Sequence, residues 1–282
     1  MAEHDADSLP RIIWMLWLQG WDRAPRVALA SRSSWQRHNP GWAVRALSQD
    51  DLATYLPPDV IEWIFSGTKR LVVIGDLIRL ELLRIHGGVW ADATTICAKP
   101  LDDWLPEVMP HGFFAFSRPV PTRMIGTWFL AAEKGSYLFH TWHSAALSYW
   151  DTENDDEYFW MHEQFEHAYL NDEHMRELWD DTPTISAQHP LHYGPDSGGL
   201  KRKAKPTLEA LLANPPSPVF KLTHKFTSEP KANSVFERLL DYANGSEPQL
   251  PYGGNDRRAS RFHCMIHKRR EPRQRRRTNR NV

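Results

Sequence analysis

Apolar positions along the first part of the chain predict strands that alternate with helices. The run RIIWMLWLQG, residues 11–20, is β-rich and apolar, and it predicts a buried strand. Helical spacing follows at residues 24–38, and residues 42–49 alternate like a second strand. A further helical stretch lies around residues 49–66. This order predicts an α/β fold whose sheet is largely parallel at its start.

The strongest helical pattern in the chain is DLIRLELLRIH, residues 76–86. Leucines recur on several sides of this segment, which predicts a buried helix, and Gly87 stands where a helix-ending glycine belongs. Asp76 begins the segment, where a carboxylate caps free backbone N–H groups. The residues GVWAD predict a short strand that ends at Asp92. Because small residues follow Asp92, we expect its carboxylate to be exposed, with little cover.

Weaker patterns complete the expected secondary structure. Further strands are predicted at residues 112–118 and 127–134, and residues 218–225 are predicted to form a short strand or a loop. Helical segments are predicted at residues 136–150 and 158–180, both rich in aromatic residues and histidine.

Three charged residues are expected to meet at one end of this sheet. Ligands of α/β sheets bind outside the carboxyl ends of the strands, and Asp92 closes a strand. Arg79 lies three positions after Asp76 and shares its helix face. Together they suit a sugar nucleotide. Asp92 would hold a divalent metal, Asp76 would accept hydrogen bonds from hydroxyls, and Arg79 would bind a phosphate or sugar oxygen. The structural alternative makes Asp76 a helix cap, Arg79 its ion-pair partner and Asp92 a turn residue.

Composition sets the scale of the fold and narrows the classes of partner. Hydrophobic residues make up 41% of the 282 positions, enough for a sizeable core. The net charge of −1 favours neither nucleic acid nor acidic partners. Residues 257–282, however, contain eleven Lys or Arg against one acid. We expect a basic, disordered tail there, and peripheral contact with phosphate or an anionic membrane surface is its functional alternative.

Other features favour a cytoplasmic protein. The N-terminal sequence MAEHDADSLPR is acidic and lacks the apolar core of a secretory signal, and no apolar run approaches the length of a membrane span. Cys97 and Cys264 are far apart and lack zinc-ligand spacing. The histidines form neither an HExxH nor a Cys/His pattern, so we expect no zinc site.

The segment GDLIRLELLRIHGGVWADAT, followed by CAKPLDDWL, resembles the donor-binding core of the capsular polysaccharide synthesis proteins. These are bacterial glycosyltransferases related to the DXD-containing sugar transferases of the Och1 mannosyltransferase and clostridial toxin type. The resemblance covers about residues 10–226, through PRIIWMLWLQGWDRAP, SWQRHNPGWAVRAL, GTWFLAAEKG, YFWMHEQF and VFKLTHK.

This resemblance implies a GT-A-type nucleotide-sugar-binding fold, a Rossmann-like mixed sheet flanked by helices, with added C-terminal helices. It implies one glycosyltransferase domain at residues 1–256, with a donor-binding core at about residues 10–135 and a helical acceptor-side part at about residues 136–226. The implied reaction moves a hexose from a UDP- or GDP-sugar to a glycan or lipid-linked acceptor. Retention of configuration and a role in capsular or other surface polysaccharide synthesis are implied as well.

The catalytic and metal-binding residues are also implied by the resemblance. Asp76 and Arg79 match the donor-contacting Asp and Arg, and Asp92 matches the first Asp of DXD. Thr94 stands where DXD has its second Asp. We therefore expect Mn²⁺ or Mg²⁺ at Asp92 and Thr94, with the diphosphate supplying the remaining ligands. Gly75 replaces the usual Ser or Ala before Asp76, which opens room near the donor.

Two further groups of residues are expected to bind the donor. Trp17 and Trp21 resemble the segment that cradles the nucleotide base, and stacking on either ring is expected, with core or lid packing as the alternative. In KLTHK, the residues Lys221, His224 and Lys225 are expected to close on the diphosphate. Their alternative is a solvated basic strand end.

Three residues are expected on the acceptor side of the site. Trp128 lies in a motif near the donor or acceptor cleft, with a core strand as the alternative. His162 and Glu163 lie on an aromatic-rich helix, where packing and surface exposure are the alternative.

Two other classes of function remain open. Because Thr94 removes one anionic ligand, the chain is also compatible with a degenerate module that binds a nucleotide sugar or glycan without turnover. The basic tail alone points to a nucleic-acid-associated protein, and no recognition motif accompanies it.

Overall fold

The computed structural model describes residues 9–67, 69–150, 157–194, 198–226 and 228–249. The basic tail expected at residues 257–282 lies outside this part of the chain. Within the described residues, no helix combines the length and the apolar character that crossing a membrane requires.

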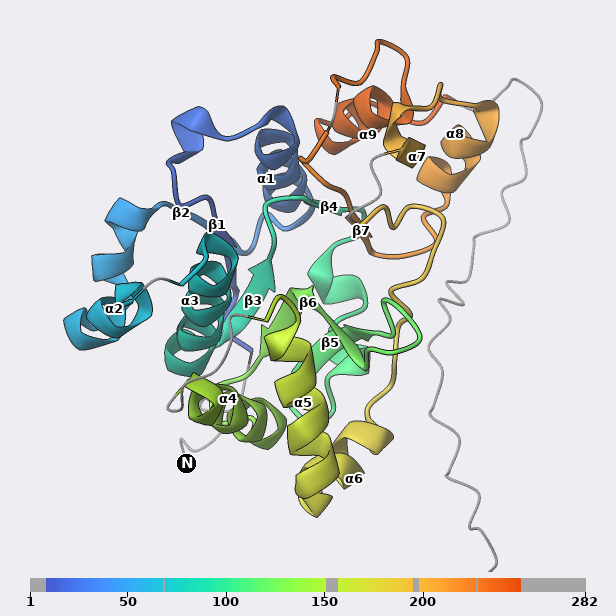
Figure 1. The fold of residues 1–282 in the computed structure, drawn as a ribbon. Coiled ribbons are helices and arrows are strands. Elements are labelled where there is room, and N and C mark those ends of the chain that lie inside the picture. Colours follow the sequence, from blue (N-terminus) through green and yellow to red (C-terminus); the bar gives the residue numbers. More distant parts are fainter. Residues whose placement is uncertain (1–8, 68, 151–156, 195–197, 227, 250–282) are drawn as a thin grey trace, which may run out of the picture.

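A five-stranded mixed sheet lies at the centre of the fold, with helices on both of its faces (Figure 1). In spatial order its strands are β2 (Ala43–Leu47), β1 (Ile12–Leu16), β3 (Gly88–Ala91), β6 (Ile125–Ala132) and β5 (Phe113–Ser117). Strand β1 pairs in parallel with β2 and β3, whereas β6 runs antiparallel to β3 and β5. The predicted α/β class, with a parallel start to the sheet, is confirmed.

Alternating side chains of the strands bury both faces of this sheet. Trp14 and Leu16 of β1 join one hydrophobic cluster, and Ile13 and Met15 join the other, because successive strand residues point to opposite faces. The first cluster lies under α3, α4, α5 and α6, and the second contains Trp35 of α1. These helices are α1 (Arg26–His38), α3 (Leu71–His86), α4 (Tyr137–Trp150), α5 (Trp160–Asn171) and α6 (Glu173–Asp181).

A second, two-stranded sheet links the middle of the chain to its later part. Strand β4 (Thr95–Cys97) runs antiparallel to β7 (Val219–Lys221), with Thr95 opposite Lys221. Figure 1 shows α7, α8 and α9 gathered beside this pair, and a third hydrophobic cluster joins them. The bounds of these helices and of the remaining short elements are α7 (Gly198–Lys201), α8 (Pro206–Ala213), α9 (Val235–Ala243), η1 (Trp21–Arg23), η2 (Gln49–Thr54), α2 (Pro58–Phe65), η3 (Leu101–Asp103) and η4 (Pro106–Val108).

Two glycines form the tight connection between α3 and β3. The backbone angle φ is 66° at Gly87 and 95° at Gly88, in the region that favours glycine. A Cβ atom at Gly88 would lie 2.7 Å from the carbonyl oxygen of Ile12, and one at Gly87 would lie 3.0 Å from that of Ala132. Strand β3 therefore enters the sheet close to its neighbours because both positions lack a side chain.

The helix that carries Asp76 is longer than the sequence pattern predicted. Helix α3 begins at Leu71, after Arg70, rather than at Asp76. Asp76 therefore lies inside the helix, and the expectation that it caps the amino end is wrong. The extra turn is rich in β-branched residues and contains a glycine, which have low helix propensity. Burial of Val73 and Ile74 outweighs that propensity and keeps the segment helical.

The helix expected at residues 158–180 is divided into α5 and α6. Asp172 follows the last residue of α5 and caps α6, because its carboxylate accepts a hydrogen bond from the Met175 backbone N–H at 2.7 Å. One aspartate thus ends one helix and begins the next.

Candidate active site

The candidate site lies where α3, β3 and the β4–β7 pair meet. Asp92 directly follows β3, and its backbone N–H donates to the Trp128 carbonyl at 2.9 Å. The Asp92 carbonyl accepts hydrogen bonds from the Thr95 N–H at 3.0 Å and from the Thr95 hydroxyl at 2.7 Å. These bonds attach Asp92 to β6 and hold the turn that leads through Thr94 into β4.

The Asp92 carboxylate is enclosed by hydrogen-bond donors. Its Oδ1 accepts from Arg79 Nη2 at 3.0 Å and from Trp90 Nε1 at 2.9 Å. Its Oδ2 accepts from Lys221 Nζ at 2.7 Å, and 24% of the side chain is exposed. The expectation of an exposed carboxylate with little cover is therefore wrong. The cover comes from side chains of other elements and not from the small residues that follow Asp92.

Arg79 joins two carboxylates. Its Nη1 lies 3.2 Å from Asp76 Oδ1, and its Nη2 lies 3.0 Å from Asp92 Oδ1. The guanidinium also lies 4.9 Å from the centre of the Trp90 ring, a cation–π contact. The second oxygen of Asp76 accepts a hydrogen bond from Trp160 Nε1 at 3.2 Å. Helix α3 and strand β3 thus bring Asp76, Arg79 and Asp92 together as the sequence predicted, and the i,i+3 ion pair is present as well.

Lys221 is the last residue of β7, and its side chain reaches Asp92 from the second sheet. Its Nζ donates to Asp92 Oδ2 and to Thr94 Oγ1, each at 2.7 Å. The neighbouring Leu222 N–H donates to the Thr94 carbonyl at 2.8 Å, which continues the pairing of β7 with β4. We refer to Asp76, Arg79, Asp92 and Lys221 as the charged cluster.

Positive charge keeps Asp92 ionised despite its surroundings. Burial on its own raises the pKa of this carboxyl. The charges of Lys221 and Arg79, together with the hydrogen bonds from Lys221 and Trp90, outweigh burial and place the pKa below its ordinary value. Such a carboxylate holds cations well and is a weak base.

Trp17 and His224 meet beside the charged cluster. Their ring centres are 5.3 Å apart in an edge-to-face arrangement. Burial and then the charges of Lys225 and Lys221 lower the pKa of His224, whereas Asp92 acts to raise it. His224 is therefore in electrostatic contact with the cluster, and the Trp17 ring lies next to it.

Trp21 and Lys225 are placed differently. The Trp21 indole N–H donates to the Leu47 carbonyl at 2.9 Å, and the Arg32 guanidinium lies 5.1 Å from its ring centre. Trp21 is thus half-buried and anchored at the end of β2, which agrees with the packing alternative. Lys225 is exposed, and its charge acts on His224.

Trp128 and His192 border the site on the side of β6. The Trp128 ring stacks on Phe116 at 4.7 Å and lies 5.7 Å from the His192 ring. Only 7% of Trp128 is exposed, and its Nε1 finds no hydrogen-bond partner in the part of the chain that the structure describes. Burial and the charge of Lys221 lower the pKa of His192 to about 4. The Trp128 ring therefore belongs to the core, while its N–H group remains unpaired.

His162 lies on α5, and its ring meets the edge of Phe159 at 5.6 Å. Burial, followed by the charges of Arg123 and Arg79, lowers the pKa of His162 to about 4, so that the ring is neutral at pH 7. Its Nδ1 has no partner within the described ranges. Glu163 is exposed at the next position of α5. The structure thus places His162, but not Glu163, within electrostatic reach of the charged cluster.

Comparison with known proteins assigns the chain to a family. Residues 2–239 match the capsular polysaccharide synthesis protein family. The chain belongs to this family. The membership agrees with the mixed α/β sheet and with the GT-A-like fold expected from the sequence.

Curated relatives of this family member are named as glycosyltransferases. The glycosyltransferase afumC of Aspergillus fumigatus is 30% identical over 166 residues, which are 51% of this chain and 42% of that protein. The O-glycosyltransferase PaGT of Phomopsis amygdali is 28% identical over 156 residues, 49% of this chain and 38% of that protein. The initiation-specific alpha-1,6-mannosyltransferase of Candida albicans is 25% identical over 118 residues, 36% of this chain and 28% of that protein. The chain thus spans less than half the length of these relatives.

Among solved structures, the glycosyltransferase GlyE of Streptococcus pneumoniae aligns with 85% of this chain and 61% of its own, at 11% identity and a TM-score of 0.49. A likeness of this size adds nothing to the family assignment, which rests on the sequence match.

The residues of this family member do not fit a resident divalent cation at Asp92 and Thr94. Hard cations such as Mg²⁺ require several oxygen ligands, among which carboxylates carry the charge. Among the described residues, no three His, Cys, Asp or Glu side chains lie close enough together to hold a metal ion. Both oxygens of Asp92 and the Thr94 hydroxyl already accept hydrogen bonds from cationic or indole donors. A metal at this position would have to displace Lys221.

Three side chains around the site escaped sequence reasoning. Trp90 donates to Asp92 from two residues before it, and the alternation of side chains along a strand is a signal that predicts this shared face. Trp160 reaches the site from α5, and His192 reaches it from the segment after α6. Nothing in the sequence around either residue predicts that it lies near Asp92.

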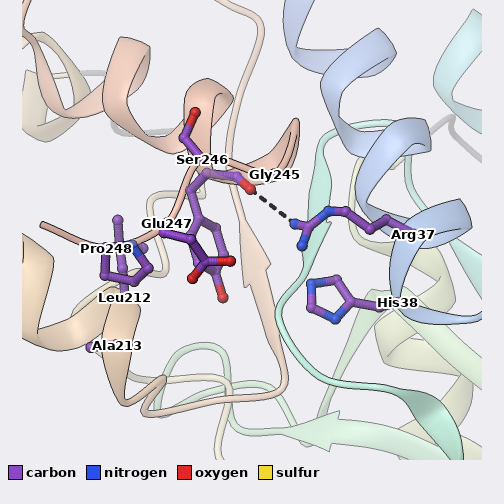
Figure 2. A pocket seen from close by; sticks show the side chains of 9 residues that line it. Arg37, His38, Leu212, Ala213, Gly245, Ser246, Glu247 and Pro248 are labelled. Carbon is purple, nitrogen blue, oxygen red and sulfur yellow. Dashed lines mark hydrogen bonds between the residues drawn. The ribbon is translucent and has the colours of Figure 1, made fainter.

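A pocket of about 390 Å³ lies elsewhere, between the ends of α1, α8 and α9 (Figure 2). Arg37 and His38 line one wall, and Arg37 Nη2 donates to the Tyr242 carbonyl at 2.9 Å. Burial and the charge of Arg37 lower the pKa of His38 to about 4. The pocket contains none of the predicted site residues. The pocket is therefore separate from the candidate site.

Proposed function

We propose that this chain is a glycosyltransferase that moves a sugar from a nucleotide-diphosphate sugar to a glycan or lipid-linked acceptor. The observation that carries the proposal is the charged cluster, in which Arg79 and Lys221 flank Asp92 where β3 ends. Ligands of α/β sheets bind at this edge. Membership of the capsular polysaccharide synthesis protein family supports a role in capsular or other surface polysaccharide synthesis.

The donor is proposed to bind across the charged cluster. Arg79 presents a planar guanidinium, and Lys221 presents an ammonium group, two side chains suited to phosphate oxygens. The Trp17 ring and His224 lie beside Lys221 and offer a stacking surface for the base of a UDP- or GDP-sugar. Asp76 accepts hydrogen bonds, which suits ribose or sugar hydroxyls.

The proposed reaction is a displacement at the anomeric carbon. The bond from this carbon to the β-phosphate oxygen breaks, and its electron pair leaves with the diphosphate. An acceptor hydroxyl oxygen forms the new bond to the same carbon. We propose that the hydroxyl proton passes to the leaving phosphate oxygen, on the face that the diphosphate leaves, which retains the configuration. The lowered pKa of Asp92 supports this course, because a carboxylate held by two cations is a poor general base.

The acceptor is proposed to enter beside Trp128 and His162. Both side chains carry a polar nitrogen without a partner in the described part of the chain, and a sugar hydroxyl can satisfy each. Glu163 is exposed on the same helix as His162 and is proposed to contact the acceptor outside the buried site. A cytoplasmic location, with membrane contact through residues 257–282, stays a prediction from the sequence.

The second candidate function is a nucleotide-sugar or glycan binding module without turnover. It is favoured by Thr94, an uncharged residue at the place where the DXD motif has its second aspartate. The arrangement of cations that binds a diphosphate would serve such a module equally well.

Release of free nucleotide separates the two functions. The full chain is incubated with pooled UDP- and GDP-sugars, with and without Mn²⁺, and free UDP or GDP is measured. We expect release from the wild type and a loss of roughly 100-fold in Asp92→Asn, because this carboxylate holds Arg79 and Lys221 in the positions from which they stabilise the departing diphosphate. Glu62→Gln removes an exposed carboxylate of α2 and should release nucleotide like the wild type. Binding of a nucleotide sugar without any release would establish the module instead.

A further inference from the structure

The Lys221 ammonium lies between the side chains of Asp92 and Thr94, the residues at the two aspartate positions of the DXD motif. Its Nζ lies 2.7 Å from Asp92 Oδ2 and 2.7 Å from Thr94 Oγ1. A cation bound by these same two oxygens would lie between them. The protein therefore already supplies a positive charge at the place where the motif predicts a metal.

The position of this ammonium is built into the fold. Lys221 ends β7, and β7 pairs with β4 along its whole length. Its chain neighbours Phe220 and Leu222 are fully buried, and only 16% of the Lys221 side chain is exposed. Lys221 is thus held from both sides, unlike a surface lysine whose ammonium samples many positions.

The remaining groups of the site complete the electrostatic balance. Asp92 Oδ1 is taken by Arg79 and Trp90, so that neither oxygen of this carboxylate is left without a donor. The two carboxylates of the charged cluster are matched by its two cations. A divalent ion added here would meet the charge of Lys221 at close range with one shared carboxylate to hold it.

We propose that Lys221 takes the role of the divalent cation and neutralises the donor diphosphate, so that nucleotide binding needs no metal. This inference rests on the proposed function. An ammonium group has three N–H donors, and the hydrogen bonds to Asp92 and Thr94 use two of them. The third donates to a phosphate oxygen of the donor. When the anomeric C–O bond breaks, its electron pair stays on the diphosphate next to this ammonium, and Lys221 keeps its proton throughout.

The test compares nucleotide binding with and without metal. Isothermal titration calorimetry and thermal shift are carried out on the full chain with UDP and GDP, once in excess EDTA and once in Mn²⁺. We expect one of these nucleotides to bind with dissociation constants that agree within about threefold under the two conditions, a difference of less than about 0.7 kcal/mol. A dissociation constant more than tenfold weaker in EDTA would overturn the inference.

A variant assigns the effect to the lysine. Lys221→Met keeps the unbranched shape and most of the length of the side chain and removes the charge. In EDTA we expect it to bind the nucleotide roughly 10- to 100-fold more weakly, the usual worth of a hydrogen bond from a charged group. Because Asp92 and Thr94 then lose their cation, Mn²⁺ should strengthen binding to the variant. Lys231→Met removes an exposed lysine from the loop before α9 and should bind like the wild type.

The outcomes separate this inference from the proposed function. Binding that needs Mn²⁺ in the wild type, or wild-type affinity of Lys221→Met in EDTA, overturns the role of Lys221 and leaves the transferase proposal standing. Failure of the wild type to bind any UDP- or GDP-sugar or nucleotide, with or without metal, overturns both. The comparison of the wild type in the two buffers does not depend on the folding of any variant.

Discussion

The guanidinium of Arg79 lies 3.0 Å from the carboxylate of Asp92 and so joins the middle of α3 to the residue that follows β3. The same side chain reaches back to Asp76 at 3.2 Å. Because all three side chains are largely removed from water, each charge depends on the others. The stability of the fold and the proposed ligand binding therefore depend on the same three side chains.

Replacement of Arg79 should expose that coupling. A lysine offers a single ammonium and can satisfy one carboxylate but not both. We expect Arg79→Lys to lower the free energy of unfolding by about 1–3 kcal/mol and to weaken nucleotide binding as well. Urea denaturation and calorimetry measure the two effects.

Arg84→Lys is the matched control for this substitution. Arg84 lies on the same helix and pairs with Glu81 at i,i+3, but 35% of its side chain is exposed. We expect it to cost less than about 1 kcal/mol, since partly exposed pairs contribute little. Equal losses in the two variants would show that Arg79 does not bridge two carboxylates in solution.

Glu81 should make the stability of the protein depend on pH in the acid range. His143 Nε2 lies 2.6 Å from Glu81, which ties α4 to α3. Burial raises the pKa of Glu81, but its hydrogen bonds with His143 and Arg84 and their charges lower it below the ordinary value of 4.5. A lowered pKa stabilises the fold above pH 4.5, and this contribution is lost as the pH falls through the lower, folded-state value.

The variant Glu81→Gln keeps the shape of the side chain and removes its titration. We expect the wild type to be more stable than this variant at pH 6, and the gap to narrow from about pH 4.5 downward. Chemical denaturation at several values between pH 6 and pH 3 measures the gap. A gap that stays constant across this range would contradict the lowered pKa.

Trp128 should affect the acceptor more than the nucleotide. In Trp128→Phe the ring keeps its stacking on Phe116 but loses the unpaired Nε1. We expect the KM for the acceptor to rise roughly 2- to 10-fold, the range of one neutral hydrogen bond, with little change in nucleotide affinity.

Trp104→Phe provides the comparison for Trp128. Trp104 belongs to the same hydrophobic cluster and also has an Nε1 without a described partner. It lies outside the proposed acceptor side, so its variant should leave the acceptor KM unchanged. Parallel changes in both variants would assign the effect of Trp128 to core packing.

Gly75 offers a gain in stability. A Cβ atom there would meet no atom within 4 Å, and the residue lies inside α3. We expect Gly75→Ala to raise the free energy of unfolding by about 0.5–1 kcal/mol, because alanine loses less backbone entropy in a helix. Gly88→Ala should do the opposite, since its Cβ would lie 2.7 Å from the Ile12 carbonyl. Thermal melts of the two variants should therefore shift in opposite directions.

Local pattern accounts for much of the fold and for three of the four members of the charged cluster. The helix that carries Arg79 and the strand that ends at Asp92 are adjacent in sequence, so their meeting follows from a single helix–turn–strand unit. The sequence pattern places the amino end of α3 five residues too late. The residues LVVIG have low helix propensity, and burial keeps them helical. Tertiary packing decided that boundary.

Long-range pairing accounts for what the pattern could not predict. The motif KLTHK marks a basic strand end, but nothing in it specifies that Lys221 would lie opposite Thr95 and contact Asp92. The same holds for His192, whose segment is placed by packing against β6 and β7. Asp92 and Thr94, the residues expected to hold a metal, thus both accept hydrogen bonds from Lys221.

The pairing of β4 with β7 also has a consequence for the order of folding. Its two strands are separated by more than a hundred residues, so their closure costs more loop entropy than the contacts within α3 and β3. The parallel strands and α3 can form early from local contacts, with Asp92 held by Arg79 and Trp90. During synthesis, the ammonium that balances this carboxylate arrives only after β7 has emerged. The charged cluster is therefore completed late in folding, after the sheet that supports it.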